Sequence, residues 1–130
     1  MKLSRLGHAA VLVETAATRV LIDPGVYSDT WHALDDLDAV LITHQHPDHV
    51  DVAGVHGLVG ANPGIRVLVE GQVAPLLAER RLDAEVVTTG TVFDLGDIKA
   101  EVVGGAHAVI HARIPRVGNV GYLLSEAAGT

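Results

Sequence analysis

The sequence predicts a single α+β domain in which helices lie on one face of a β-sheet. Short runs of β-branched and leucine residues alternate with Gly, Pro and Asp, as expected of strands and turns. Strand-like runs come first, and helix-like and strand-like segments then alternate, an order that favours a sheet covered by helices. A length of 130 residues suits one domain with a core but not two, so we assign residues 1–130 to one domain.

Nine strands are expected along the chain. The first six are short β-branched runs bounded by turn residues, at Lys2–Leu6, Ala10–Glu14, Arg19–Asp23, Ala39–Ile42, Arg66–Val69 and Glu85–Thr88. Thr91–Leu95 and Asp97–Val103 form a hairpin that turns at Gly96 and Asp97. The last strand is expected at Asn119–Ser125.

Two segments carry helix signals. Val52–Val59 follows Asp51, whose carboxylate is a favourable N-cap. Gln72–Arg80 ends on a basic residue, which suits the negative end of the helix dipole. Its apolar positions are Val73, Leu76 and Leu77. Both segments therefore predict helices that pack on the sheet.

The composition limits the chemistry and the partners. Hydrophobic residues make up 48% of the chain but aromatic residues only 3%, so the core must be built from Val, Leu, Ile and Ala. The net charge of −7, with no basic cluster beyond Arg80 and Arg81, argues against a nucleic-acid partner. The absence of cysteine leaves His and Asp as metal ligands. Without a signal pattern or an apolar run of about 20 residues, we expect a cytoplasmic protein without membrane contact.

The most informative segment is residues 44–49, His-Gln-His-Pro-Asp-His, which directly follows the apolar run Ala39–Ile42. It holds four potential metal ligands in six positions. Side chains two apart in an extended segment point the same way, so His44 and His46 can bind one ion from one side. We therefore predict a metal site here and not a solvated histidine-rich loop.

The second part of the segment offers another pair of ligands. Pro47 interrupts the extended run, and Asp48 and His49 can then present their side chains as an adjacent set. Imidazole and carboxylate together suit zinc and its first-row neighbours, whereas calcium and magnesium prefer oxygen ligands alone.

The pattern His44-x-His46-x-Asp48-His49 resembles the signature of the metallo-β-lactamase superfamily, a group of mostly zinc-dependent hydrolases. The resemblance runs from Met1 to about Leu124 and is closest to the branch of ascorbate-6-phosphate lactonase-like proteins. The segments that support it are Leu6–Glu14, Val20–Gly25, Val40–Thr43 and Gly104–His107. The resemblance implies an αββα sandwich, of which this chain supplies roughly the N-terminal sheet-and-helix half.

The resemblance also implies a first metal site made by His44, His46 and His107. Three histidines leave one tetrahedral position for a water, whose pKa the ion lowers to about 7. His111 is the rival for the third position, but Pro115 argues against a helix that would pair it with His107. We favour His107.

A second site would use Asp48 and His49. The family completes this site with a bridging Asp and a late His, and no candidate for either precedes Thr130. We therefore expect a metal-dependent hydrolase of impaired activity, in which metal-bound hydroxide attacks a small-molecule ester, lactone or phosphodiester. Asp48 would ligate the ion and orient the nucleophile. The cofactor is expected to be one or two Zn²⁺ ions, with Mn²⁺ and Fe²⁺ also compatible.

The rival interpretation is a metal-binding half-domain without turnover. A single half would leave an apolar sheet face in water, which normally marks an interaction surface. The partner covering that face would be a second copy, giving a homodimer, or a C-terminal half.

Four further residues are candidates for the site. Asp23 and His8 each have two possible interpretations, and Tyr27 and Trp31 have one each. Asp23 either orients a ligand histidine through its free N–H or forms an Asx-type turn before Pro24. His8 either lines the pocket or is a partly buried structural histidine. Tyr27 and Trp31, in the loop after Asp23, are candidates for an apolar wall over the site.

Overall fold

The computed structural model describes residues 1–104 and 118–126, which form two sheets and two helices. The larger sheet has six strands in the order of the sequence. They are β1 (Lys2–Arg5), β2 (Val11–Glu14), β3 (Arg19–Ile22), β4 (Ala39–Ile42), β5 (Arg66–Glu70) and β6 (Glu85–Val87). The first three strands are antiparallel, and β3 to β6 are parallel.

This topology brings several turns to one edge of the sheet. The carboxyl ends of β3, β4 and β5 meet there because these strands are parallel. The turn between β1 and β2 lies at the same edge, since Arg5 pairs with Val11 and Val11 pairs with Ile22. Residues that follow β3 and β4 therefore lie beside the residues of the first turn.

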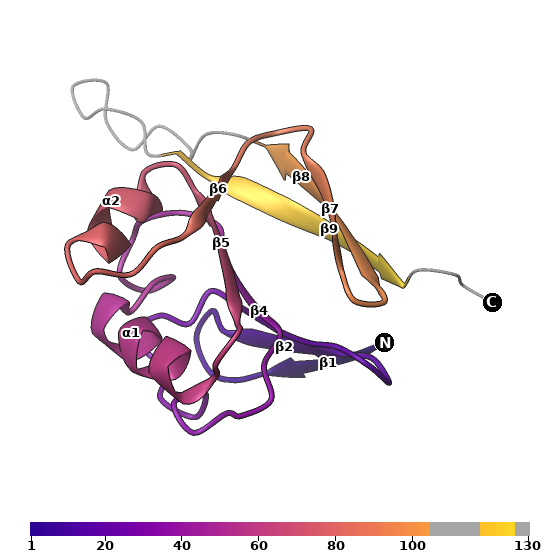
Figure 1. The fold of residues 1–130 in the computed structure, drawn as a ribbon, viewed down its shortest axis with the longest axis horizontal. Helices are drawn as coiled ribbons and strands as arrows, with labels where there is room; N and C mark the ends of the chain where they lie inside the picture. The colour runs from indigo at the N-terminus through magenta and orange to yellow at the C-terminus, as the bar shows by residue number, and fades with distance from the viewer. Residues whose placement is uncertain (105–117, 127–130) are drawn as a thin grey trace.

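Two helices cover one face of the large sheet, α1 (Val52–Ala61) and α2 (Val73–Ala78) (Figure 1). Asp51 caps α1 as predicted, because its carboxylate accepts a hydrogen bond from the Gly54 amide at 3.0 Å. The core beneath the helices consists mainly of aliphatic side chains and includes Leu21, Val40, Ile42, Val55, Leu58, Val69 and Leu77. None of the helices in residues 1–104 and 118–126 has the length and hydropathy needed to cross a bilayer.

The helix ends differ from the predicted ones for local reasons. α1 continues to Ala61, and the buried Asn62 follows it, with its amide donating to the Leu58 carbonyl at 2.9 Å. α2 ends earlier than predicted, at Ala78, where the chain tightens: the Arg81 amide bonds back to the Ala78 carbonyl at 2.9 Å. Arg81 itself adopts a left-handed conformation with φ of 58°.

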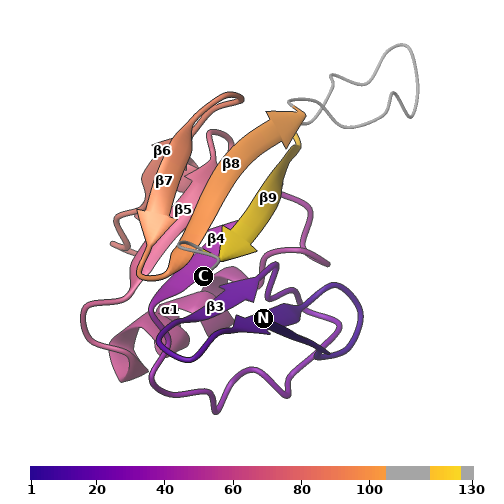
Figure 2. The same ribbon diagram turned by 90° about the vertical axis from the view of Figure 1, so that its right-hand side faces the viewer.

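The other face of the large sheet is covered by a second, antiparallel sheet made of β7 (Val92–Leu95), β8 (Ile98–Gly104) and β9 (Val120–Glu126) (Figures 1 and 2). The two sheets enclose a second core of buried side chains, Val13, Val20, Ala39, Leu41, Leu68, Val87, Leu95, Ile98, Val102 and Val120. The expectation that this apolar face would stand in water is therefore wrong. Strands β7, β8 and β9 form a separate layer and do not extend the large sheet.

Strand β9 is tied to the end of β4, where the histidine motif begins. The hydroxyl of Tyr122 donates to the Ile42 carbonyl at 2.9 Å, and the Val120 amide donates to the Thr43 carbonyl at 2.9 Å. His44 and Asn119 form an isolated antiparallel bridge. Burial raises the pKa of the Tyr122 phenol, which therefore keeps its proton and remains a donor.

Replacing Tyr122 with Phe is expected to destabilise the fold by about 1 kcal/mol, because the Ile42 carbonyl loses its donor in a buried place. Urea unfolding measures the change. Tyr27→Phe is the matched control, since its ring is 73% exposed and its hydroxyl should contribute little. Equal stability of both variants would contradict a stabilising contact between the sheets.

The pair Arg66 and Glu85 joins β5 to β6 at the surface, with guanidinium to carboxylate distances of 2.7 and 2.8 Å. The hydrogen bonds from Arg66 lower the pKa of Glu85 from its ordinary value of 4.5. The contribution is therefore present above about pH 4.5 and lost as the pH falls through the lower, folded-state pKa. We expect Glu85→Gln to cost less than about 1 kcal/mol at pH 7, because exposed pairs are screened. The difference from the wild type should shrink below pH 4.5 in urea titrations, and a constant difference would argue against the pair.

Candidate metal centre

The histidine motif forms a tight turn at the carboxyl end of β4. The amides of His49 and Val50 both donate to the His46 carbonyl, at 2.8 and 3.1 Å. This turn folds Asp48 and His49 back toward the strand end. His44 is buried, with 4% of its surface exposed, whereas the side chains of Asp48 and His49 are 31% and 27% exposed.

Among the residues that the structure describes, two groups of side chains have the spacing needed to hold a metal ion. His44, His46 and Asp48 form one group, and Asp23, His44 and His49 form the other. In each group the potential ligand atoms lie within 4.8 Å of one another. The ring centroid of His44 is 4.9 Å from that of His46 and 4.1 Å from that of His49. A donor set of imidazole nitrogens and carboxylate oxygens fits a first-row cation.

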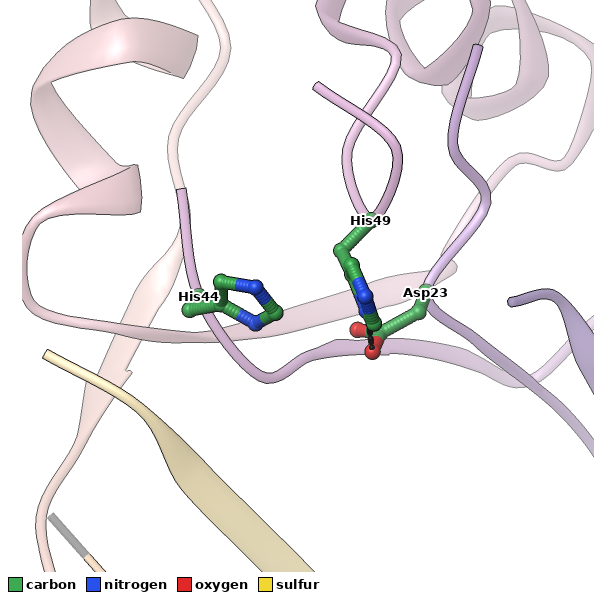
Figure 3. Close-up of side chains that lie close together, drawn as sticks. All are labelled: Asp23, His44 and His49. Carbon is green, nitrogen blue, oxygen red and sulfur yellow. Dashed lines mark hydrogen bonds and ion pairs between the residues drawn. The ribbon is translucent and has the colours of Figure 1, made fainter. Parts of the chain in front are cut away.

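Asp23 lies directly after β3 and close to His49 (Figure 3). It is 4% exposed. Its Oδ2 accepts a hydrogen bond from His49 Nδ1 at 2.6 Å and another from the Thr43 hydroxyl at 2.6 Å, and its Oδ1 accepts from the Thr43 amide at 2.8 Å. A carboxylate can only accept, so Nδ1 of His49 carries the hydrogen and Nε2 is left for a metal. Asp23 has φ of 50°, a left-handed conformation that Asp tolerates better than most residues.

Thr43 extends the same hydrogen-bond network to His44. Its hydroxyl hydrogen is given to Asp23, so its oxygen accepts from His44 Nδ1, which lies 2.9 Å away. His44 therefore presents Nε2 to the cluster. Sequence reasoning missed Thr43, although its position directly before the motif was a usable signal.

The charges around the turn shift two pKa values in opposite directions. Burial acts to raise the pKa of the Asp48 carboxyl, but the hydrogen bond from His8 and the charge of His49 outweigh it and lower the pKa. The hydrogen bond to Asp23 raises the pKa of His49 against the opposing effect of burial. Asp48 is thus kept as a carboxylate, the form in which a carboxyl group can bind a cation.

The loop that follows β3 lies against the motif. The Val26 amide donates to the Pro47 carbonyl at 2.9 Å, and the Asp51 amide donates to the Pro24 carbonyl at 2.8 Å. Between them, Gly25 lies so close to the backbone of Asp48 that a Cβ atom would overlap it. A side chain at position 25 would therefore push the motif away from the loop.

The remaining candidate residues have different outcomes. His107 and His111 lie outside the described residues. The prediction that Trp31 helps to form an apolar wall over the site is wrong, because its side chain is fully buried in the core beneath the helices. Tyr27 is exposed and its ring stands edge-on to His8. The side chain of His8 is 49% exposed, and its Nε2 lies 3.0 Å from Oδ2 of Asp48.

Comparison with known sequences identifies the family. Residues 2–130 match the family described as "Beta-lactamase superfamily domain". The chain belongs to this family. It is 39% identical over 127 residues to Protein Rv0786c of Mycobacterium tuberculosis, a match that covers 98% of this chain and 58% of the relative. It is 30% identical over 108 residues to a UPF0173 metal-dependent hydrolase of Aeropyrum pernix, covering 80% of this chain and 44% of the relative.

The fold of this beta-lactamase superfamily chain recurs in solved structures. CmlA, a diiron β-hydroxylase from Streptomyces venezuelae, matches with a TM-score of 0.72 at 20% identity, covering 97% of this chain and 27% of CmlA. At that identity the likeness shows the fold alone. The predicted metallo-β-lactamase-like fold is confirmed, and the chain spans about half the length of the curated relatives that it matches.

Replacing Asp23 with Asn is expected to weaken metal binding by about 10- to 100-fold, the usual cost of losing an orienting partner of a ligand. The NH₂ group of the Asn side chain would face at least one of the three groups that now donate to the carboxylate, and two donors cannot bond to each other. Zinc titration of the apo protein against a chromophoric chelator measures the loss.

Asp35→Asn is the matched control, because the Asp35 side chain is 85% exposed and has no hydrogen bond to the motif. An Asp23→Asn variant that binds zinc as tightly as the wild type would show that the network does not orient the ligands.

Proposed function

We propose that this chain carries the metal-binding part of a metal-dependent hydrolase that cleaves an ester, lactone or phosphodiester. The observation that carries the proposal is the cluster of three histidines and two carboxylates at the neighbouring ends of β3 and β4, in which His49 donates a hydrogen bond to the buried Asp23. The name of the Aeropyrum pernix relative, a metal-dependent hydrolase, supports the same chemistry.

Each side chain has a role in the proposed site. His44 and His46 hold the first ion, with His107 as the proposed third ligand. Asp48 and His49 hold a second ion, and Asp48 also orients the attacking water. Bound zinc would lower the pKa of its water to about 7 and so supply a nucleophile at neutral pH.

The open side of the cluster is where substrate would approach. Asp48 and His49 are partly exposed, whereas His44 and Asp23 are buried. We propose Zn²⁺ as the cofactor, with Mn²⁺ or Fe²⁺ as alternatives, because His and Asp ligands accept all three. For this chain we propose weak hydrolysis, because the described residues give the second ion only Asp48 and His49.

A second candidate function is a metal-binding module that pairs with another copy of itself. The outer face of the small sheet favours it, because Val92 and Leu123 are 51% and 59% exposed there. Light scattering distinguishes the monomer from the homodimer. A stable monomer that hydrolyses substrate would exclude this candidate function.

The deciding experiment loads the apo protein with zinc and assays hydrolysis of a nitrophenyl ester, a lactone and a bis-nitrophenyl phosphate. We expect zinc binding at micromolar concentration and slow turnover of at least one substrate. His44→Ala should lower the zinc affinity by more than about 100-fold, beyond the usual cost of an outer-shell partner.

His56→Ala is the matched control, because His56 is exposed on α1 and lies outside both ligand groups. An apo protein that takes up no zinc would refute the metal site. Zinc uptake without turnover of any of the three substrates would refute the hydrolase and leave the binding module.

A further inference from the structure

His8 makes a long-range contact with the motif. Its Nε2 lies 3.0 Å from Oδ2 of Asp48, although the two residues are 40 positions apart in the sequence. The carboxylate can only accept, so the Nε2–H of His8 donates. His8 lies in the turn between β1 and β2, which the antiparallel pairing of β1, β2 and β3 brings to the edge where the motif begins.

The backbone around His8 is built for this approach. Gly7 has φ of 101°, a conformation that favours glycine, and a Cβ atom there would lie 2.5 Å from the Cβ of Ser28. The first turn therefore lies directly against the loop after β3. The Arg5 side chain donates to the Gly7 carbonyl at 3.1 Å, and the Thr30 hydroxyl donates to the Leu6 carbonyl at 3.3 Å.

Two neighbouring rings stand edge-on to the His8 imidazole. Its centroid is 5.4 Å from that of Tyr27, with the ring planes at 81°, and 6.3 Å from that of His49, with the planes at 77°. Edge-to-face arrangements at these distances are favourable. These two ring contacts restrict the His8 imidazole while its Nε2 donates to Asp48.

We propose that His8 is a positioning residue for Asp48, holding this carboxylate in the orientation needed to bind a divalent first-row cation. The inference rests on the metal site proposed above. Asp48 has an oxygen within 4.8 Å of ligand nitrogens of both His44 and His46. His8 thereby does for Asp48 what Asp23 does for His49: an outer partner restricts the rotation of a ligand before the ion arrives.

The test is zinc titration of the apo protein against a chromophoric chelator. We expect His8→Ala to lower the zinc affinity by about tenfold, at the lower end of outer-shell effects because the contact is partly exposed. His8→Gln can still donate an N–H from its side chain and should recover most of the affinity.

The matched control is His32→Ala. His32 is 48% exposed at its side chain, stands edge-on to Trp31, and lies 3.6 Å from the Asp51 carboxylate outside the cluster. Its loss should leave zinc affinity unchanged. Urea midpoints of both apo variants should match the wild type, which separates positioning from folding.

A double-mutant cycle assigns the effect to the contact. In an Asp48→Ala background, His8→Ala should no longer change zinc affinity, because the group it positions is gone. If the wild type binds zinc and His8→Ala binds it equally well, the positioning role is wrong while the metal site stands. If the wild type binds no zinc, the metal site itself fails.

Discussion

The geometry of the histidine cluster depends on the hydrogen bonds that the buried carboxylate of Asp23 accepts. A carboxylate that is 4% exposed is costly unless donors satisfy it, and here the Thr43 amide, the Thr43 hydroxyl and His49 Nδ1 do so. Hydrogen bonds to a charged group are each worth about 1.5–3 kcal/mol, so the donors cannot move away cheaply. The end of β4 and the turn after it are therefore fixed relative to β3.

The rest of the fold supports this contact from two sides. Behind the motif, β9 donates from Val120 to the Thr43 carbonyl, and Tyr122 donates to the Ile42 carbonyl. In front of it, the backbone at Gly25 leaves no room for a side chain next to Asp48. The small sheet and the loop after β3 thus limit the same short segment, and the apolar core between the sheets supplies the stability that keeps them in place.

The sequence predicted the parts of this arrangement that depend on local order. The alternation of apolar runs with turn residues predicted the strand bounds to within a residue or two, and Asp51 correctly indicated the start of α1. The spacing of the motif predicted that His44 and its neighbours would gather. The pattern of neighbouring residues carries no information on how layers stack. The separate second sheet and the burial of Trp31 were therefore not predicted. Contacts across long separations, such as His8 with Asp48, depend on strand pairing and could not be derived from spacing.

The distribution of burial divides the cluster into a fixed side and an open side. His44 and Asp23 are enclosed. Asp23 accepts from the Thr43 amide, the Thr43 hydroxyl and His49, and the Thr43 hydroxyl accepts from His44, so neither side chain can rotate without leaving a buried polar group unsatisfied. Asp48 and His49 are partly exposed: His8 donates to Asp48, His49 donates to Asp23, and His49 Nε2 lies 3.6 Å from Oδ2 of Asp48. The contact between His8 and Asp48 is more exposed than the contact between His49 and Asp23, so water screens it more. The rings of Tyr27 and His49 stand edge-on to the His8 imidazole. In the proposed site, the enclosed side fixes where an ion sits, and the exposed side sets how readily Asp48 turns toward it.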